Sequence, residues 1–440
     1  MRGSNHSLLE TPNVYEAIGV ARLVPEQFPQ MNISPESEEV PVRDAEVEEA
    51  LAGLPKGLDE LARVERLRKQ LGTSRGRRAA ELHELRRRAR RRFPSGELRY
   101  LTRKGLEQAT PERVAAARAS DFLARATSGC VLDATCGLGA DSLGLAAAGD
   151  RLVSADRDPW LAQHALANLR AAGHPGNVIV ADALHPPLTA DWLLVDPDRR
   201  ADGRRSMSPA EWSPTLAQCI ARAATCRGAA IKLPPAFDPA RHPALFADAP
   251  LHTFEWCSLD GTLVEAVLWL GELAEGRPSA AARILTGAGS DERVGGAREP
   301  IDPHDTAQAH EVQWIADPDP ALLRAGQLER VARAAGLRPL ARELAYLGGD
   351  AAPPAPGLAY FRVLGSAPLD RKQVRALLAA HDVGPLTVKK RGHQDSAETL
   401  ATRFARKQGR RGTLIVARLA DSHRAYLVEP QVREDGIGGR

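Results

Sequence analysis

One stretch of the chain, residues 130–144, constrains the fold more than any other. It reads CVLDATCGLGADSLG, an apolar run that ends in Asp133, followed by Gly137 and Gly139 and then by the first turn of an expected helix. Because glycine has no side chain, the backbone of such a turn can approach a ligand closely. The pattern predicts an α/β domain with a parallel sheet, in which this turn forms part of a site for a nucleotide-type ligand.

A second acid narrows the choice of ligand. The next apolar run, residues 151–156, ends in Asp156, a suitable acceptor for ribose hydroxyls. A dinucleotide and S-adenosylmethionine (SAM) both fit this plan. The dinucleotide fingerprint needs glycine or alanine where this chain has Ser142, and Asp133 would repel a pyrophosphate. A ligand with an ammonium and a sulfonium meets no such repulsion, so the sequence favours SAM.

The composition excludes several classes of protein. The 440 residues are enough for two or three domains, and the formal net charge is only +3. The five cysteines form no Cys-x-x-Cys pair and leave an odd thiol, which argues against a disulfide framework or a zinc site and favours a reducing cytoplasm. Since no apolar run approaches the length of a membrane span, we expect neither a membrane segment nor a metal.

The order of patterns along the chain predicts its domains. Alternating strand and helix patterns in the central part indicate a parallel sheet, with helices expected over 158–173, starting at Asp158 and Pro159, and over 208–226. A further helix is expected over 319–335. Two β-rich runs joined by Asp260 and Gly261 predict a hairpin at its end. The expected regions are a disordered acidic tail at 1–50, a helical N-terminal module at 51–128, the ligand-binding core at 129–275, an extension and linker at 276–365, and a small α/β domain at 366–440.

The order of acids and glycines resembles the motif series of class I SAM-dependent methyltransferases. More narrowly, the chain resembles a bacterial family of these enzymes with a THUMP-like C-terminal domain, over roughly residues 85–430. The resemblance implies a Rossmann-like, seven-stranded sheet whose last strand is antiparallel, with SAM as the cofactor. The stretches that carry it are Leu106–Pro111, Asp133–Gly139, Asp196–Arg200, Asp317–Gly326 and Gly384–Gly392.

The resemblance also implies a role for each residue of the cofactor site. Gly137 and Gly139 would pass beneath the methionine and ribose of SAM, with Asp133 near its ammonium. Asp156 would bind the ribose hydroxyls, and Asp182 the adenine edge. The ordinary role for either acid alone is a helix cap or a turn residue.

The stretch from Asp196 to Arg200 stands where this family has its catalytic motif. In relatives that methylate amines, an Asp/Asn-Pro-Pro-aromatic loop accepts hydrogen bonds from the target amine and stacks on its base. Here Asp198 replaces the second proline and Arg199 replaces the aromatic residue, although a guanidinium can stack on a base or bind a phosphate. The predicted catalytic residues are therefore Asp196, Pro197, Asp198 and Arg199, with Asp196 orienting the amine.

Cys257 and Lys232 are candidates for two other chemical roles. Methylation of uracil C5 needs a cysteine thiolate as nucleophile, and Cys257 falls in an expected strand, where a packed thiol is the usual state. Direct transfer to nitrogen is therefore favoured. Lys232 is a candidate for a substrate phosphate, but a partly buried lysine stem is an equally good explanation.

Basic segments make RNA the expected partner, although solvated surface arginine remains the alternative. The sequence predicts a cytoplasmic methyltransferase of a base nitrogen, such as guanine N2, in a structured RNA. The alternatives are a methyltransferase of a small molecule or protein, or a non-catalytic RNA-binding protein that retains the fold. The basic segments are Arg75–Arg92 and a terminal set, Lys389, Lys390, Arg391, Arg403, Arg406, Lys407, Arg410 and Arg411.

Overall fold

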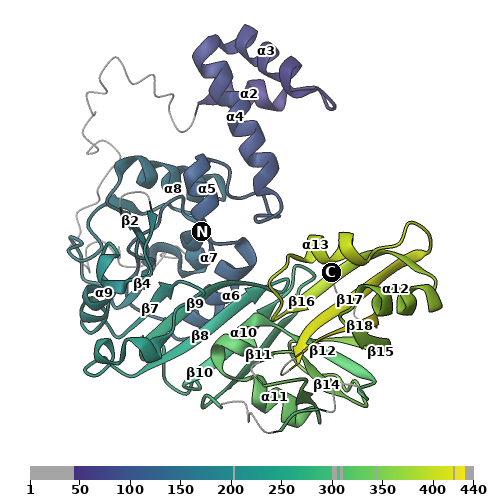
Figure 1. The fold of residues 1–440 in the computed structure, drawn as a ribbon. Coiled ribbons are helices and arrows are strands. Elements are labelled where there is room, and N and C mark those ends of the chain that lie inside the picture. Colours follow the sequence, from purple (N-terminus) through teal and green to yellow (C-terminus); the bar gives the residue numbers. More distant parts are fainter. Residues whose placement is uncertain are drawn as a thin grey trace, which may run out of the picture. The chain divides into compact units, whose positions relative to one another are not determined.

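The computed structural model describes residues 44–201, 204–299, 305–307, 311–342, 344–419 and 422–431 (Figure 1). These residues divide into two compact units. Unit 1 holds those up to Leu233 together with His242–His252 and Trp269–Glu275. Unit 2 holds Pro234–Arg241, Thr253–Leu268 and those from Gly276 onward.

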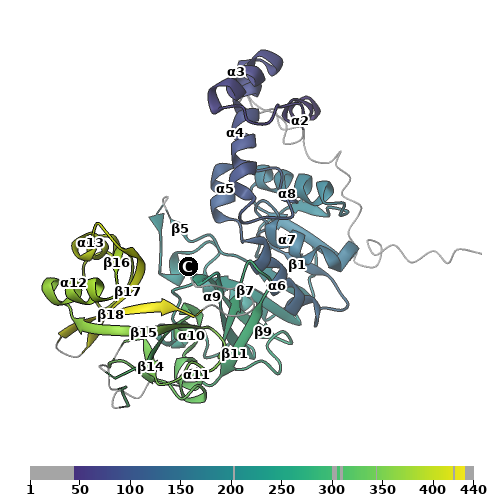
Figure 2. The ribbon, with the colours of Figure 1, turned by 90° about the vertical axis from the view of Figure 1, so that its right-hand side faces the viewer.

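The first part of unit 1 is helical. Its helices are α2 (Ala45–Ala52), α3 (Glu60–Leu71), α4 (Thr73–Ala89), α5 (Arg103–Gln108) and α6 (Glu112–Leu123). Helices α2, α3 and α4 share a small core of Val47, Ala50, Leu67 and Ala79. In both ribbon views α2 and α3 lie at one end of α4, away from the strands of unit 1 (Figures 1 and 2).

The predicted disordered tail lies almost entirely outside the described residues. Its last residues are described, and for residues 45–50 the prediction is wrong, because they belong to α2. The side chain of Asp44 caps this helix by accepting hydrogen bonds from the backbone N–H groups of Glu46 and Val47. An acidic stretch that looks suited to disorder is thus ordered by its own capping residue and by burial of Val47.

Unit 1 also contains a parallel sheet. Its described strands are β1 (Val131–Asp133), β2 (Leu152–Asp156), β3 (Val178–Val180), β4 (Trp192–Val195) and β7 (Gly228–Leu233). They lie in the order β7-β4-β1-β2-β3, and each neighbouring pair is parallel. Because the carboxyl ends of parallel strands share one edge, this order brings Asp133, Asp156 and Asp196 to the same edge of the sheet.

Short helices connect these strands. The elements are α7 (Ala140–Leu145), η2 (Ala146–Arg151), α8 (Pro159–Ala171), η3 (Pro209–Glu211), α9 (Leu216–Ala223) and η5 (Pro243–Leu245). Helix α8 begins as predicted, with Asp158 as the cap and Pro159 at the first position. The helix expected over 208–226 is only partly present, because Pro214 disfavours helical backbone at the residue before it and α9 begins after Thr215.

Strand β9 (Thr262–Gly271) belongs to both units, and its last residues follow β7 in the strand order of unit 1. In unit 2 the order is β11-β10-β8-β9, with β8 (His252–Leu259), β10 (Ala280–Leu285) and β11 (Asp291–Gly296). Asp260 and Gly261, which join β8 to β9, have φ angles of 50° and 73°. Two positive φ angles are typical of the tight hairpin turn, so the predicted hairpin is confirmed.

Unit 2 contains a second sheet, in the order β13-β14-β12-β15-β18-β17-β16. Helices α12 and α13 pack on it through Val374, Leu378, Leu400 and Phe404, which share a core with strand residues. Its strands are β12 (Trp314–Pro318), β13 (Arg338–Pro339), β14 (Leu347–Gly349), β15 (Leu358–Pro368), β16 (Val383–Arg391), β17 (Arg410–Leu419) and β18 (Ser422–Pro430). The helical elements of unit 2 are η4 (Pro239–Arg241), α10 (Pro320–Ala325), α11 (Leu328–Ala334), α12 (Arg371–Ala380) and α13 (Ala397–Phe404).

Two expectations for unit 2 need correction. The single helix expected over 319–335 is two helices, because Gly326 adopts a left-handed conformation (φ 67°) and ends α10. The expected boundary between residues 365 and 366 falls inside β15, so no linker separates the extension from the terminal domain there.

The fold class predicted from the resemblance is confirmed. Strands β1, β2, β3, β4 and β7 form the parallel part of the sheet, and β8 and β9 form the antiparallel hairpin. The expected number of seven strands is wrong, because β10 and β11 bring the described sheet to nine. No helix in the described ranges combines the length and the apolar character that crossing a membrane requires.

The small core of α2–α4 gives a stability prediction with a matched control. Leu67 is fully buried, whereas Leu61 on the same helix is 70% exposed. We expect Leu67→Ala to lower the opening free energy of this helical module by about 2–5 kcal/mol, because the lost contacts leave a cavity. Leu61→Ala should change it by less than about 0.5 kcal/mol. Amide hydrogen exchange over residues 45–89 measures both, and equal effects would contradict the described packing.

Candidate active site

The acid at the end of β1 is buried beneath the glycine turn. Asp133 is 2% exposed, and its Oδ2 accepts a hydrogen bond from Ser142 Oγ at 2.6 Å. Ser142 Oγ accepts in turn from Ser154 Oγ at 2.8 Å. The serine that departs from the dinucleotide fingerprint therefore joins α7 to β1 and β2. A contact between Asp133 and the ammonium of SAM stays a prediction.

The two glycines of the turn have different constraints. Their φ angles are 54° for Gly137 and 86° for Gly139, a region that favours glycine. A Cβ at Gly139 would come within 3.2 Å of the Ala165 backbone, so this glycine allows α8 to pack closely. A Cβ at Gly137 would meet nothing within 4 Å. Open space therefore lies beside Gly137, as a cofactor cradle requires.

Asp156 holds the same turn from β2. Its Oδ2 accepts a hydrogen bond from the Gly137 N–H at 2.9 Å, and its Oδ1 accepts one from the Asp158 N–H at 2.9 Å. Burial raises its pKa above the usual value. Each carboxylate oxygen can accept a second hydrogen bond, so ribose hydroxyls fit this acid without breaking the turn.

Asp182 lies two residues beyond β3 and is exposed. Its Oδ1 accepts a hydrogen bond from the Leu184 N–H at 2.8 Å, which is the ordinary role of a turn residue. The preceding residue, Ala181, donates its N–H to the Asp156 carbonyl at 3.1 Å. Asp182 is therefore adjacent to the end of β2, and a contact with adenine stays a prediction.

The carboxyl end of β7 carries a buried charge cluster that the sequence did not predict. Lys232 is 7% exposed, and its Nζ lies 2.7 Å from Thr110 Oγ1, 2.9 Å from Asp141 Oδ2 and 2.5 Å from Asp196 Oδ2. Arg118 donates to the other oxygen of Asp141. We call Thr110, Arg118, Asp141, Asp196 and Lys232 the Lys232 cluster.

Two neighbouring acids of the turn have opposite pKa shifts. Burial and the charge of Asp141 raise the pKa of Asp133 to about 7, against a hydrogen bond from Ser142. Burial would also raise the pKa of Asp141, but Arg118 and Lys232 lower it to about 2. Asp141 is thus a fixed anion, whereas Asp133 gains its charge only near neutral pH.

The predicted catalytic loop is held by backbone contacts. The Asp196 N–H donates to Thr135 Oγ1 at 2.7 Å, which ties the loop to the residues after β1. Asp198 exchanges two backbone hydrogen bonds of 2.9 Å with Ser213, and the Arg199 carbonyl accepts one of 2.8 Å from Ser206. Strands β5 (Arg200–Ala201) and β6 (Arg204–Arg205) then form a two-stranded hairpin. Pro197 is buried between these contacts.

The structure therefore brings together residues that lie in four separate parts of the sequence. Asp133, Gly137, Gly139 and Asp156 meet at the turn, and Asp196 meets Lys232 beside it. Sequence reasoning missed Thr110, Arg118 and Asp141. Thr110 does not cap α6, because Pro111 occupies that position, and the Thr110 hydroxyl donates to Asp141 at 3.1 Å. The signal that could have identified Thr110 is its position in Leu106–Pro111, one of the stretches that carry the family resemblance.

The cysteines give no nucleophile. All five thiols are free. Burial raises the pKa of Cys130 to about 11 and that of Cys219 to about 12. Cys257 is buried in β8, with its Sγ 3.8 Å from the Ser258 carbonyl. Since the thiolate is the reactive form, these environments oppose covalent catalysis. Over the described ranges, no group of three or more metal-binding side chains is present.

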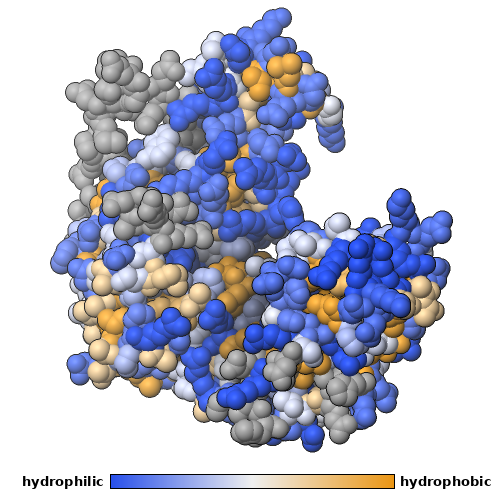
Figure 3. Space-filling view, viewed as in Figure 1, coloured by the Kyte–Doolittle hydropathy of each residue, from blue (hydrophilic) through white to orange (hydrophobic). Residues whose placement is uncertain are grey.

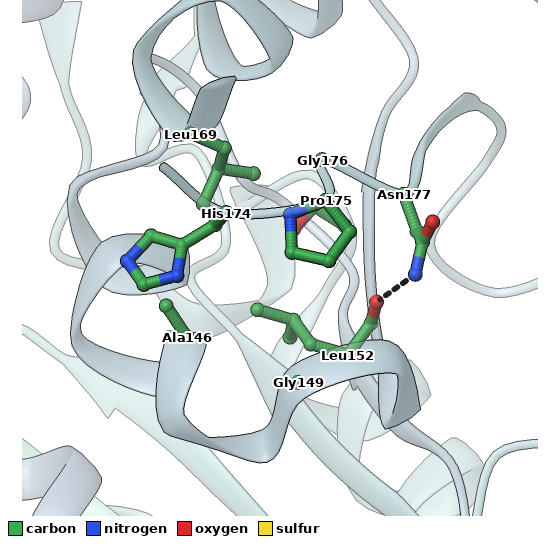
Figure 4. Close-up of a pocket in the computed structure, with 9 residues that line it drawn as sticks. Ala146, Gly149, Leu152, Leu169, His174, Pro175, Gly176 and Asn177 are labelled. Carbon is green, nitrogen blue, oxygen red and sulfur yellow. Dashed lines mark hydrogen bonds between the residues drawn. The ribbon is translucent and has the colours of Figure 1, made fainter. Parts of the chain in front are cut away.

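A pocket in unit 1 lies at the opposite edge of the sheet. It is lined at the amino ends of β2 and β3 by residues that include Leu152, Leu169, His174 and Asn177 (Figure 4). The empty space in it, open solvent included, is about 230 Å³. Because ligands of open α/β sheets bind at the carboxyl ends of the strands, this pocket is not the cofactor site.

Comparisons with known proteins agree with this geometry. Residues 358–430 match a family described as THUMP domain-like. Two proteins of Mycobacterium tuberculosis, from strains CDC 1551 / Oshkosh and ATCC 25618 / H37Rv, are each 32% identical over 333 residues, or 75% of this chain and 88% of theirs. Both are named as uncharacterized S-adenosylmethionine-dependent methyltransferases. A solved structure from Porphyromonas gingivalis W83, assigned to the methyltransferases, covers 85% of this chain and 98% of its own at 20% identity, with a TM-score of 0.66.

The raised pKa of Asp133 predicts a pH dependence of stability. Because the pKa is 3.8 in an open chain and about 7 here, the folded state binds this proton more tightly. The stabilisation is complete below the open-chain pKa and is lost as the pH rises toward 7. Asp133→Asn cannot ionise, so it should remove this loss, on the order of 1.4 kcal/mol for each unit of pKa shift.

Chemical denaturation at about pH 4 and about pH 7 measures the effect. The parent should lose more unfolding free energy between the two pH values than Asp133→Asn does. Asp150→Asn, at an exposed position, is the control and should follow the parent. Parallel curves for the parent and Asp133→Asn would show that Asp133 is ionised without penalty.

Proposed function

The chain belongs to the S-adenosylmethionine-dependent methyltransferases, and from this premise we propose that it transfers a methyl group directly to a base nitrogen, such as guanine N2, of a structured RNA. SAM is the cofactor, and when bound it would supply an electrophilic methyl group. The transfer breaks the S–CH3 bond and forms an N–CH3 bond, so that S-adenosylhomocysteine is left and the acceptor nitrogen loses one proton to water. The observation that carries the RNA part of the proposal is the THUMP domain-like match of residues 358–430.

The cofactor fits the turn between β1 and α7. The open space beside Gly137 and the two acids that hold the turn, Asp133 and Asp156, support this assignment. We assign the ribose hydroxyls to Asp156 and the adenine edge to Asp182. Gly139 keeps the turn close to α8, so the backbone beneath the cofactor has one defined path.

Asp196 is proposed to receive the acceptor amine. Its carboxylate is 36% exposed, and Lys232 occupies Oδ2, while Oδ1 has no partner within the described part of the chain. A carboxylate accepts hydrogen bonds only, so Oδ1 can hold an amine N–H and stabilise the positive charge that develops on its nitrogen. Arg199, whose guanidinium has no hydrogen bond or ion pair with a described residue, is the candidate to stack on the base.

The contacts of the terminal basic residues refine the proposed RNA surface. Lys389 Nζ lies 3.2 Å from Asp317, and Arg391 lies 2.8 Å from the same carboxylate. Asp317 therefore neutralises part of this charge. Lys390 donates to the His393 carbonyl at 2.7 Å and keeps its full charge.

Other basic side chains of the same domain are more available. Lys407 and Arg411 are exposed, and neither has an acidic partner in the described ranges. Hydrophilic residues cover the surface over α12 and α13 (Figure 3). Arg410, by contrast, pairs with Glu429 at 3.4 Å. We propose that Lys407 and Arg411 contact RNA phosphates together with Lys390.

The N-terminal basic segment has a mixed character. Arg75 pairs with Asp44 and Glu46, and Arg86 pairs with Glu48 at 2.5 Å. Arg92 donates to the backbone carbonyls of Leu106 in α5 and of Ala109 just after that helix. These arginines stabilise the helical module. We propose RNA contacts only for the exposed arginines of this segment without an acidic partner in the described ranges, Arg77, Arg88, Arg90 and Arg91. Arg87 is also exposed, but it pairs with Glu84 at 2.7 Å. The five free cysteines fit the proposed cytoplasmic setting.

The proposed reaction predicts a single chemical change in a deletion strain. We expect one N-methylated nucleoside to be lost from its RNA and to return when the parent chain is supplied. Asp196→Ala should not restore it, because removing a group that stabilises developing charge costs about 100- to 1,000-fold in rate. Nucleoside mass spectrometry of the total RNA measures the change.

Two measurements accompany this experiment. Calorimetry should give Asp196→Ala a SAM affinity within about threefold of the parent, since Asp196 lies outside the cofactor turn. Cys257→Ala is the control and should restore the nucleoside fully, because no covalent step is proposed. Unchanged RNA with a newly unmethylated protein or metabolite would redirect the proposal to that acceptor.

The proposed RNA surface predicts a ranking of salt dependences. Each phosphate contact adds close to one unit to the slope of log affinity against log salt. Replacing Lys407 and Arg411 by Ala should therefore flatten the slope by about two units. Replacing Lys389, Lys390 and Arg391 together should flatten it by only about one unit, because the charged groups of Lys389 and Arg391 are both directed to the Asp317 carboxylate and away from a phosphate.

Filter binding to total RNA at several salt concentrations tests this ranking, with SAM affinity as the control for folding. If the triple substitution flattens the slope by about three units, Asp317 does not shield these cations. If neither set changes the slope, the exposed arginines of the N-terminal basic segment become the proposed contact with RNA.

A further inference from the structure

We propose that Lys232 is a positioning residue for methyl transfer, which holds Asp196 by one oxygen and leaves the other oxygen for the acceptor amine. The inference rests on the proposed function, in which Asp196 meets that amine. It adds a requirement that the catalytic loop alone does not supply, namely a fixed orientation of the Asp196 side chain.

The ammonium of Lys232 is fully engaged. Its three N–H donors face three acceptors, on Thr110, Asp141 and Asp196, at 2.5–2.9 Å. With two of these acceptors on other elements, the third bond fixes where the Asp196 carboxylate lies. Lys232 is 7% exposed, whereas the side chain of Asp196 is 36% exposed. The lysine can therefore act on the amine that receives the methyl group only through Asp196.

Packing alone does not explain a lysine at this position. Every residue of β7 is buried, and the neighbours of Lys232 in the strand are Ile231 and Leu233. Burying an ammonium is unfavourable because it loses its hydration, and an apolar residue of similar length would avoid this penalty. The cost is offset here by two carboxylates, one of them belonging to the predicted catalytic motif.

The second carboxylate gives the lysine a fixed anchor. Asp141 lies in the first turn of α7, two residues after Gly139, and Arg118 pairs with its other oxygen. The Lys232 cluster therefore links the turn proposed to hold the cofactor with the loop proposed to hold the acceptor. If Lys232 is replaced, Arg118 still pairs with Asp141, so the cofactor turn keeps its charge balance.

A double-mutant cycle separates positioning from a purely structural role. The variants are Lys232→Met, Asp196→Ala and the double substitution. Single-turnover methylation of total RNA from the deletion strain and calorimetric SAM binding are measured for each. We expect Lys232→Met to lower the transfer rate by about 10- to 100-fold, because small misplacements of a reacting group have effects of this size. SAM affinity should stay within about threefold.

The decisive comparison is in the Asp196→Ala background. There Lys232→Met should lower the rate by less than about threefold, because the residue that it positions is gone. An equal loss in both backgrounds would overturn the inference. A methyl-transfer rate of Lys232→Met equal to that of the parent would also overturn it.

Two further variants complete the design. Arg227→Met removes an exposed ion pair with Glu272 just before the same strand and should keep the parent rate. If Lys232→Met does not bind SAM, Thr110→Val replaces it, since valine keeps the shape and removes one acceptor of the ammonium. We expect Thr110→Val to lower the rate by about 3- to 10-fold in the parent but not in Asp196→Ala, and an unchanged rate in the parent would overturn the inference.

The outcomes distinguish this inference from the proposed function. If Asp196→Ala methylates RNA at the parent rate, the acceptor assignment of Asp196 fails. If the parent transfers no methyl group to this RNA, the proposed substrate fails. If Asp196→Ala is slow and Lys232→Met is as fast as the parent, only the positioning role of Lys232 fails.

Discussion

A hydrogen bond between two buried side chains, Ser142 Oγ and Asp133 Oδ2, fixes the part of the structure on which the site depends. It joins the first strand of the sheet to the helix that follows the glycine turn, at a depth where water cannot replace it. Ser154 completes the contact from the neighbouring strand. The glycine turn can therefore stay open beside Gly137 and still have a defined backbone path.

The site combines two kinds of buried acid. Asp141 pairs directly with two cations, which hold its pKa at about 2 in spite of burial. Asp133 has no such pair, and the hydrogen bond from Ser142 and the charge of Lys232 do not outweigh burial and the charge of Asp141, so its pKa is about 7. Asp196 differs from both, because it is partly exposed and paired on one side only. The two buried carboxylates thus lie at the glycine turn proposed to hold the cofactor, and the partly exposed one lies where the methyl acceptor is proposed to bind.

The sequence predicted features that depend on neighbours along the chain. Strand-end acids such as Asp133 and Asp156, the capped start of α8 and the hairpin at Asp260 follow from local patterns, and the structure confirms those elements. The charge cluster could not be predicted in this way, since Lys232 and Thr110 are 122 positions apart. Likewise, the pairing of Lys389 with Asp317, 72 positions earlier, is invisible in a local count of basic residues.

The second sheet of unit 2 extends beyond the region that matches the THUMP domain-like family. Five consecutive residues of β12, Trp314–Pro318, pair with β15, and Ile315 shares a hydrophobic core with Phe361, Ile415 and Tyr426. A fragment that began at Leu358 would expose the edge of β15 and one face of that core to water. The sheet and its core therefore include β12, so a fragment meant to fold by itself would have to carry residues 314–357 as well.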